Sequence, residues 1–219
     1  MDGGTPRRYH HGRLRQAAIE AAVAEVRKVG ASGISMREIA RRAGVSHAAL
    51  AYQFGDKAGI FTAIATEGFQ MATKAIAPTA TGPDGFIRGG AVYVGFALAH
   101  PGHFEVMFRP DLYRGDDPDL IAARDAAFAV LHGSARAAVT ADTDTDVTGL
   151  VLAGWSLSHG LATLWLTANL QDKTGTDPAT LTDQITRGVI TLGQLARRHL
   201  RAPAAPDSTM AREQPSGGV

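Results

Sequence analysis

Two serine caps on either side of a glycine constrain the fold of this chain more than any other feature of its sequence. Ser35 precedes the apolar-periodic stretch 36–43, and Glu38 stands three residues after Ser35, which is the spacing of a capping box. We expect the Ser35 hydroxyl to accept from the Glu38 amide and the Glu38 carboxylate to reach back. Gly44 can then end the helix in a left-handed conformation, and Ser46 can cap a second, shorter helix. A helix, a glycine-containing turn and a second helix together indicate a helix-turn-helix.

The second helix of this motif, expected over residues 47–53, has the composition of a helix that enters the major groove of DNA. Small side chains keep such a helix narrow, polar side chains near its start reach base edges, and flanking cations bind phosphates. The small side chains are Ala48, Ala49 and Ala51, the candidates for base contacts are Ser46, His47 and Tyr52, and those for phosphate contacts are Arg37, Gln53 and Lys57. The alternative is an αα-hairpin with a purely structural role.

The distribution of charge supports a polyanionic partner for the N-terminal quarter. Residues 1–60 contain ten Lys/Arg against five Asp/Glu, whereas the rest of the chain contains twelve against sixteen. The chain has no cysteine, which excludes disulfides and thiolate metal sites, and its first 30 residues lack the apolar stretch of a secretion signal. We therefore expect the protein in the cytoplasm.

Helix caps and breakers recur along the whole chain, whereas alternating β-branched runs are scarce, so we predict an all-α fold of about nine helices. They are expected at residues 12–29, 36–43, 47–53, 57–76, 83–99, 101–108, 118–139, 146–170 and 178–200. The predicted organisation is a flexible basic arm (1–11), a three-helix DNA-binding head (12–56), a connector helix with a helical-bundle ligand-binding and dimerisation domain (57–201), and a disordered tail (202–219).

The stretch Ile34–Ile60, ISMREIARRAGVSHAALAYQFGDKAGI, resembles the DNA-binding segment of TetR/AcrR-family transcriptional regulators. Two positions depart from the family pattern: Ala51 stands where a tyrosine is usual, and Gln53 where a histidine is usual. The resemblance implies a homodimer whose two recognition helices read a pseudo-palindromic operator. It places the DNA contacts on Arg37, His47, Ala48, Ala49, Tyr52, Gln53 and Lys57.

Residues 147–170 contain no Asp, Glu, Lys or Arg, and this length would permit a transmembrane helix. Polar side chains scattered along both halves favour instead a helix buried on two sides, one against its own subunit and one against a partner. Together with helix 178–200 it would form a four-helix dimer interface. The two apolar stripes are Val147, Leu150, Gly154, Leu161, Leu164 and Ala168, and Leu152, Trp155, His159, Ala162 and Leu166.

The segment Trp155–Gly160 resembles the Trp–His–Gly (WHG) signature of one C-terminal-domain subclass of the TetR family, and residues 100–113 are similar to the corresponding stretch. The resemblance implies a pocket for a small, largely apolar effector, lined by aromatic bulk with a few polar atoms. The candidate lining residues are Phe96, His103, Phe104, Met107, Phe108, Phe128, Trp155 and His159, each of which could instead belong to the core.

We expect neither a cofactor nor a metal ion. His10 and His11 offer too few fixed ligands, and Asp142, Asp144 and Asp146 lack the glycine and distal glutamate of a calcium loop. The expected function is that of a ligand-released repressor, in which an effector bound among helices 83–139 tilts connector 57–76. The alternatives are an all-helical enzyme, for which the sequence offers no motif, and a membrane-associated helical protein.

Overall fold

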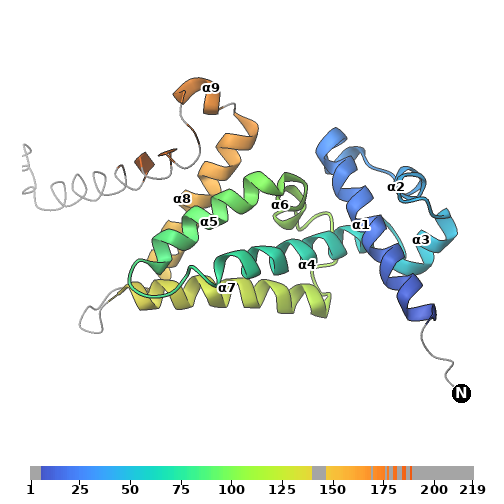
Figure 1. The fold of residues 1–219 in the computed structure, drawn as a ribbon, viewed down its shortest axis with the longest axis horizontal. Helices are drawn as coiled ribbons and strands as arrows, with labels where there is room; N and C mark the ends of the chain where they lie inside the picture. The colour runs from blue at the N-terminus through green and yellow to red at the C-terminus, as the bar shows by residue number, and fades with distance from the viewer. Residues whose placement is uncertain are drawn as a thin grey trace, which may run out of the picture. The chain divides into compact units, whose positions relative to one another are not determined.

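The structure is a computed structural model of the 219-residue chain and describes residues 6–139, 147–168 and 170–175, with positions 177, 180, 181, 184, 185 and 188. Every regular element among these residues is an α-helix, which confirms the predicted all-α class (Figure 1). The helices are α1 (Pro6–Gly33), α2 (Met36–Ala43), α3 (His47–Phe54), α4 (Lys57–Ile76), α5 (Gly85–Ala99), α6 (Pro101–Met107), α7 (Pro118–Ala138), α8 (Val147–Thr167) and α9 (Leu170–Thr174).

The chain divides into two compact units, Met1–Gly175 and Thr176–Val219. In the second unit the amide of Thr180 donates to Asp177 Oδ1 at 3.1 Å, so Asp177 caps a helical turn where the sequence predicts helix 178–200 to begin. The part of that helix after residue 188, the predicted tail 202–219 and the aspartates of the loop 140–146 lie outside the described residues.

The bounds of α2 and α4 agree with the prediction, but the first helix does not. α1 begins at Pro6 rather than at residue 12, so residues 6–11, predicted to belong to a flexible arm, continue the helix. At its other end, Gly30 interrupts the helix with φ 74° and ψ 160°, a conformation that favours glycine. The freed amide of Ala31 donates to Glu105 Oε1 of α6 at 2.8 Å, so the kink is held by a side chain of another helix.

Two later helices differ from the prediction by two residues or more, whereas α3, α6 and α7 end within one residue of it. α5 begins at Gly85 instead of residue 83, because Gly82 has a left-handed φ of 70° and the chain is still turning when it reaches Pro83. α8 ends at Thr167 instead of residue 170, and the separate short helix α9 follows it.

The largest buried cluster joins the predicted head to the helices behind it. Ile19 and Val26 of α1, Ile39 of α2 and Leu50 of α3 contribute to it from the head. Ile60, Phe61 and Ile64 of α4, Val106 of α6 and Leu120 of α7 complete it. The first three helices therefore do not have a core of their own among the described residues; they share one with α4, α6 and α7.

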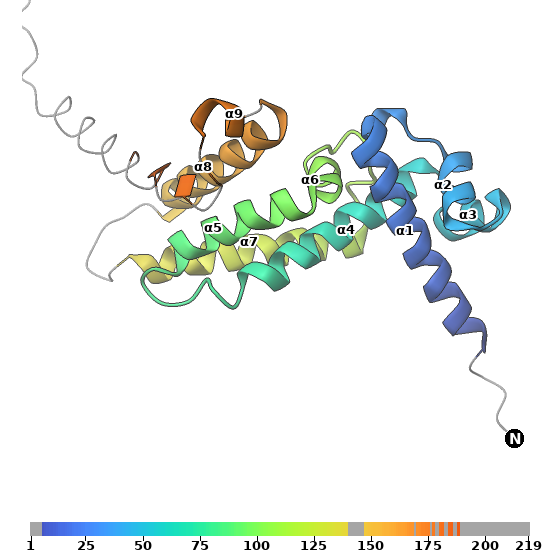
Figure 2. The same cartoon turned by 45° about the horizontal axis from the view of Figure 1, so that its top comes forward.

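Behind the head, α4 packs along α7, and α5 packs along α8 (Figures 1 and 2). The short helix α6 lies against both α4 and α1. Pro101 occupies the first position of α6, where a missing amide proton costs nothing. Gly102 then allows the close contact with α1, since an added Cβ would lie 2.9 Å from the Val23 carbonyl oxygen. At Gly102 the backbone of α6 thus comes close to the backbone of α1.

Candidate nucleic-acid interface and regulatory pocket

The helix-turn-helix forms from the predicted caps, with one difference. Ser35 Oγ accepts from the Glu38 amide at 3.2 Å, and Gly44 adopts φ 67° at the end of α2. The predicted return bond from Glu38 is replaced, because the Glu38 carboxylate accepts hydrogen bonds from Arg41 instead. This ion pair also lowers the pKa of Glu38, mainly through the hydrogen bond from Arg41. One half of the capping box is therefore present, and the other half is taken over by a neighbouring cation on the same helix.

The helix α3 buries one face and exposes the other. Ser46 Oγ accepts from the Ala49 amide at 3.0 Å, which fixes the first turn, while Leu50 and Phe54 are buried. His47 and Ala48 are exposed, and Tyr52 has 85% of its surface accessible, the largest value among the exposed large hydrophobic residues. The two predicted base-reading side chains His47 and Tyr52 therefore lie on the free face of the helix. Ser46 keeps its hydroxyl proton for donation, because the cap uses only the oxygen.

The predicted phosphate-binding residues occupy different environments. Arg37 is exposed on α2, whereas Gln53 is half-buried, as is Ala49, one of the small residues predicted to keep the recognition helix narrow. The Lys57 ammonium lies 3.3 Å from the Ser32 carbonyl oxygen and 5.4 Å from the centre of the Phe61 ring. Lys57 therefore ties the start of α4 to the end of α1, and only its remaining N–H groups are free for a phosphate.

Another cation of the head has a structural role. Arg42 of α2 forms an ion pair with Glu25, a carboxylate buried in α1. A buried charge needs such a partner, so Arg42 is held against α1.

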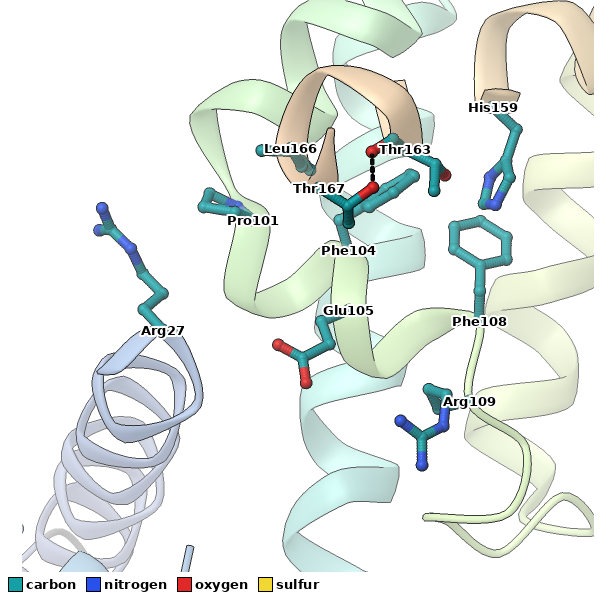
Figure 3. Close-up of a pocket in the computed structure, with 10 residues that line it drawn as sticks. All are labelled: Arg27, Pro101, Phe104, Glu105, Phe108, Arg109, His159, Thr163, Leu166 and Thr167. Atoms are coloured by element: carbon teal, nitrogen blue, oxygen red, sulfur yellow. Dashed lines mark hydrogen bonds between the residues drawn. The ribbon is translucent and has the colours of Figure 1, made fainter. Parts of the chain in front are cut away.

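A pocket of about 530 Å³ opens between α1, α6 and α8 (Figure 3). The rings of Phe104, Phe108 and His159 lie close together, and the charged side chains of Arg27 on α1, Glu105 on α6 and Arg109 after α6 also line the pocket. The lining residues are Arg27, Pro101, Phe104, Glu105, Phe108, Arg109, His159, Thr163, Leu166 and Thr167. Of the predicted lining residues, Phe104, Phe108 and His159 are among these.

The other predicted lining residues lie elsewhere. Phe96 and Met107 pack with Ala72 of α4 in a separate buried cluster, so they are core residues. Phe128 is 49% exposed on α7, where its ring lies 6.3 Å from that of His132. Trp155 stands next to the pocket: its ring centre is 6.2 Å from that of Phe108. The residue types suggested a pocket, but only the packing of the helices decides which aromatic side chains reach it.

His103, also predicted to line the pocket, is buried between α6 and α4. Its Nε2 lies 3.4 Å from Glu67 Oε1, while Nδ1 is buried and has no hydrogen-bond partner among the described residues. Burial lowers the pKa of His103, and the nearby Glu67 carboxylate opposes this effect. His103 therefore belongs to the contact of α6 with α4 and not to the pocket.

Several lining residues were not predicted. Thr163, Leu166 and Thr167 follow His159 at helical spacing, so the periodicity of α8 could have identified them once His159 was chosen. Arg27 belongs to the first helix, and Glu105 and Arg109 are charged, so neither position nor residue type pointed to them. These three depend on the packing of α1 against α6.

Inside the pocket, His159 is held by a hydrogen bond between its Nδ1 and the Tyr93 hydroxyl, 2.9 Å apart. Its ring centre lies 5.0 Å from that of Phe104 and 4.5 Å from that of Phe108. Burial lowers the pKa of His159 and raises that of Tyr93, the latter partly offset by a hydrogen bond with Trp155. Tyr93 therefore donates to a neutral imidazole, and we assign the ring proton to Nε2.

Stability is expected to decrease as the pH falls below about 6.5, the ordinary pKa of histidine. Burial lowers the pKa of His103 and of His159 in the folded protein. At His103 the Glu67 carboxylate opposes this effect and His100 adds to it. Both side chains therefore take up a proton at a higher pH in the unfolded chain than in the folded one. The stability from these groups is full above the unfolded pKa and is lost as the pH falls through the folded pKa. Melting temperatures at about pH 7.5 and 5.5 test this: we expect a smaller decrease in His103→Gln and His159→Gln than in wild type. Equal decreases in all three proteins would contradict the assignment.

Comparison with known protein families identifies the family of this chain. Residues 18–64 match the family described as bacterial regulatory proteins, tetR family, and residues 86–189 match the one described as Tetracyclin repressor-like, C-terminal domain. The chain belongs to the TetR family. No curated protein sequence matches it. The family assignment makes the chain a DNA-binding transcription regulator, with α2 and α3 as its helix-turn-helix.

Several solved structures share the fold, among them two from proteins named as members of the TetR family. A protein with unknown function from Rhodococcus sp. RHA1 is 28% identical, with a TM-score of 0.67 over 84% of this chain and 98% of that chain. A TetR-family regulatory protein from Rhodococcus RHA1 is 22% identical, with a TM-score of 0.60 over 81% and 93%. The TetR-family transcriptional regulator PfmR from Thermus thermophilus is 20% identical, with a TM-score of 0.53 over 67% and 84%.

α8 lies in the TetR-family C-terminal domain, and its buried and exposed residues do not follow the two predicted stripes. Among the described residues it is the one helix long and apolar enough to cross a membrane, by length and composition alone. Leu161 and Ala162, one from each predicted stripe, are both buried. The buried face of α8 therefore lies between the two stripes, with exposed leucines on either side of it. The match over residues 86–189 includes α8 and assigns it to the repressor-like domain. The WHG subclass stays a prediction from Trp155–Gly160.

Proposed function

We propose that this TetR-family protein is a cytoplasmic homodimeric repressor that reads a pseudo-palindromic operator and is released by a small, largely apolar effector. The observation that carries the proposal is the free face of α3. Leu50 and Phe54 hold the helix in the core, while His47, Ala48 and Tyr52 project from it with no covering element among the described residues. A helix presented in this way can enter the major groove without rearrangement of its own subunit.

A homodimer is supported by the exposed apolar side chains of α8. Leu157 is 40% and Leu164 52% exposed, and their spacing of seven residues places them on the same face of the helix. Neither residue lines the pocket. An apolar face on an otherwise uncharged helix favours contact with a second copy of the chain, with helix 178–200 completing the interface.

The effector is expected to occupy the pocket between α1, α6 and α8. Its aromatic side, formed by Phe104, Phe108 and His159, suits a flat apolar body, and the Thr163 and Thr167 hydroxyls offer a few polar contacts (Figure 3). Operators read from one face require the recognition helices about 34–36 Å apart or a multiple of that distance. A ligand that changes this spacing would release the DNA.

Selection from random-sequence DNA tests the proposal even though the operator sequence is not known. We expect the wild-type protein to enrich a sequence with two related half-sites, and a compound screen for release of that DNA then identifies effectors. Phe108→Ala is expected to keep operator affinity but to lose the response to such a compound. Phe128→Ala, which removes an equal ring from the exposed face of α7, serves as the control and should retain both. Recovery of sequences without related half-sites would overturn the proposal of a dimer.

A further inference from the structure

The stretch Glu105–Arg114, which runs from α6 toward α7, makes polar contacts with the DNA-binding head at both of its ends. At one end, Glu105 Oε1 accepts from the amide of Ala31 at the Gly30 kink, 2.8 Å away. At the other, an Arg114 guanidinium nitrogen lies 2.9 Å from Asp56 Oδ1. We call this stretch the brace. Its Glu105 and Arg109 also line the pocket, so the brace borders the pocket on one side and the head on the other.

Asp56 lies two residues after the end of the recognition helix α3 and is the N-cap residue of α4. Its carboxylate caps α4 by accepting from the Gly59 amide at 3.0 Å, and this bond, followed by the charge of Arg114, lowers its pKa. The main chain of the brace is anchored as well, because the Arg114 amide donates to Thr62 Oγ1 at 3.0 Å. Arg114 is therefore positioned by α4 and in turn contacts the cap of α4.

The space around this contact is filled. A Cβ added to Gly59 would lie 1.9 Å from the Phe54 carbonyl oxygen and 2.7 Å from the Arg114 guanidinium. Gly55, in the turn between α3 and α4, has a positive φ of 78°, and a Cβ added there would lie 3.4 Å from the Arg114 guanidinium. The last residue of α3, the first turn of α4 and the Arg114 side chain thus meet where only glycines fit.

The recognition helix has few other restraints. Within its eight residues only Leu50 and Phe54 are buried, so the direction of its axis depends on the turns at its ends. We propose that Arg114 is a positioning residue for DNA recognition: by holding Asp56, it fixes the α3–α4 turn and with it the orientation of α3. This inference rests on the proposed function, since it concerns how well α3 is presented to an operator.

The contact at Glu105 supports the same role for the other end of the brace. Ala31 is fully buried, and its amide has left the regular helix at Gly30, so it needs an acceptor. Glu105 supplies that acceptor from the body. One continuous stretch of chain, the brace, therefore contacts the head at two points, near the end of α1 and just after the end of α3.

Binding of the DNA recovered by random-sequence selection tests the role of Arg114. We expect Arg114→Gln to weaken this binding about three- to fivefold, the range of an exposed ion pair, with an unchanged melting temperature. Arg124→Gln, which removes an exposed charge near the start of α7, should bind like wild type. Asp56→Asn separates positioning from plain charge, because asparagine still caps α4 while a negative charge is lost. Electrostatics alone would strengthen DNA binding by this variant, whereas the proposal predicts weaker binding.

The double variant Arg114→Gln/Asp56→Asn should bind no more weakly than either single variant, because both remove one contact. Tighter binding by Asp56→Asn, or equal binding by Arg114→Gln and Arg124→Gln, would overturn the proposal.

Hydrogen exchange of the free protein provides a readout that needs no operator. Arg114→Gln should speed exchange of the amides at residues 54–59 and leave α7 and α8 unchanged. If the wild type selects no DNA sequence, the proposed function fails, but the exchange experiment still decides whether Arg114 restrains the turn. Unchanged exchange at residues 54–59 would show that it does not.

Discussion

A Leu157→Glu/Leu164→Glu variant is expected to be monomeric and to bind operator DNA about a hundredfold more weakly than wild type. Both leucines are exposed on one face of α8, and a carboxylate at each would have to be desolvated in a dimer interface. The loss of affinity follows because two linked half-site contacts become independent. Light scattering after size-exclusion chromatography measures the mass, and a titration with operator DNA measures the affinity.

The matched control for this variant is Phe128→Glu, which places a carboxylate at a similarly exposed apolar position on α7. We expect it to remain a dimer with unchanged operator affinity. If the α8 variant keeps the mass of a dimer, the face of Leu157 and Leu164 is not the interface. If Phe128→Glu is the monomer, the interface lies on α7.

Leu50→Ala is expected to lower the free energy of unfolding by about 2–5 kcal/mol and to abolish specific DNA binding. Leu50 is fully buried and belongs to the cluster that joins the head to α4, α6 and α7. Truncation of Leu50 leaves a cavity in the core and removes one of the two buried side chains of α3. The protein therefore loses stability, and the recognition helix is no longer held in position.

Urea denaturation followed by circular dichroism measures this effect. The control is Ile87→Ala, at an exposed position of α5, where we expect a change within about 0.5 kcal/mol. A loss of stability in Leu50→Ala no larger than that of the control would show that α3 is not held by this residue.

The helix-turn-helix could be predicted closely because its signals are local. The Ser35 and Ser46 caps and the left-handed Gly44 act within one turn of chain, so their spacing is sufficient to place α2 and α3. The prediction of the return bond from Glu38 is wrong, because a second local interaction competes with it. Arg41 lies one turn away on the same helix and competes for that carboxylate.

The pocket could be predicted only in part, because its lining depends on how helices pack. Phe104 and Phe108 reach it, whereas Met107, on the same short helix, turns toward α4 and packs with Phe96. Arg27 comes from the first helix, and a sequence pattern does not show that α1 approaches α6. The glycine at position 102, which permits that approach, was the available signal.

The division between head and body at residues 56 and 57 was also a prediction from local pattern, and it marks the start of α4 well. It does not mark a boundary between cores, since Leu50 on one side and Phe61 on the other belong to the same buried cluster. Contacts between Arg114 and Asp56 cross this point as well. Packed residues therefore connect α6, which lines the pocket, to the head in addition to α4.

Whether α3 reads DNA sequence is tested most directly by a salt-dependent titration. Wild type and a Tyr52→Ala/Lys57→Ala variant are titrated with the selected operator at several salt concentrations, with unrelated DNA as competitor. We predict saturable, competitor-resistant binding by the wild type that the variant loses. Equally weak binding by both proteins, vanishing as the salt concentration rises, would mean that only charge attraction is present and that the helix-turn-helix is structural.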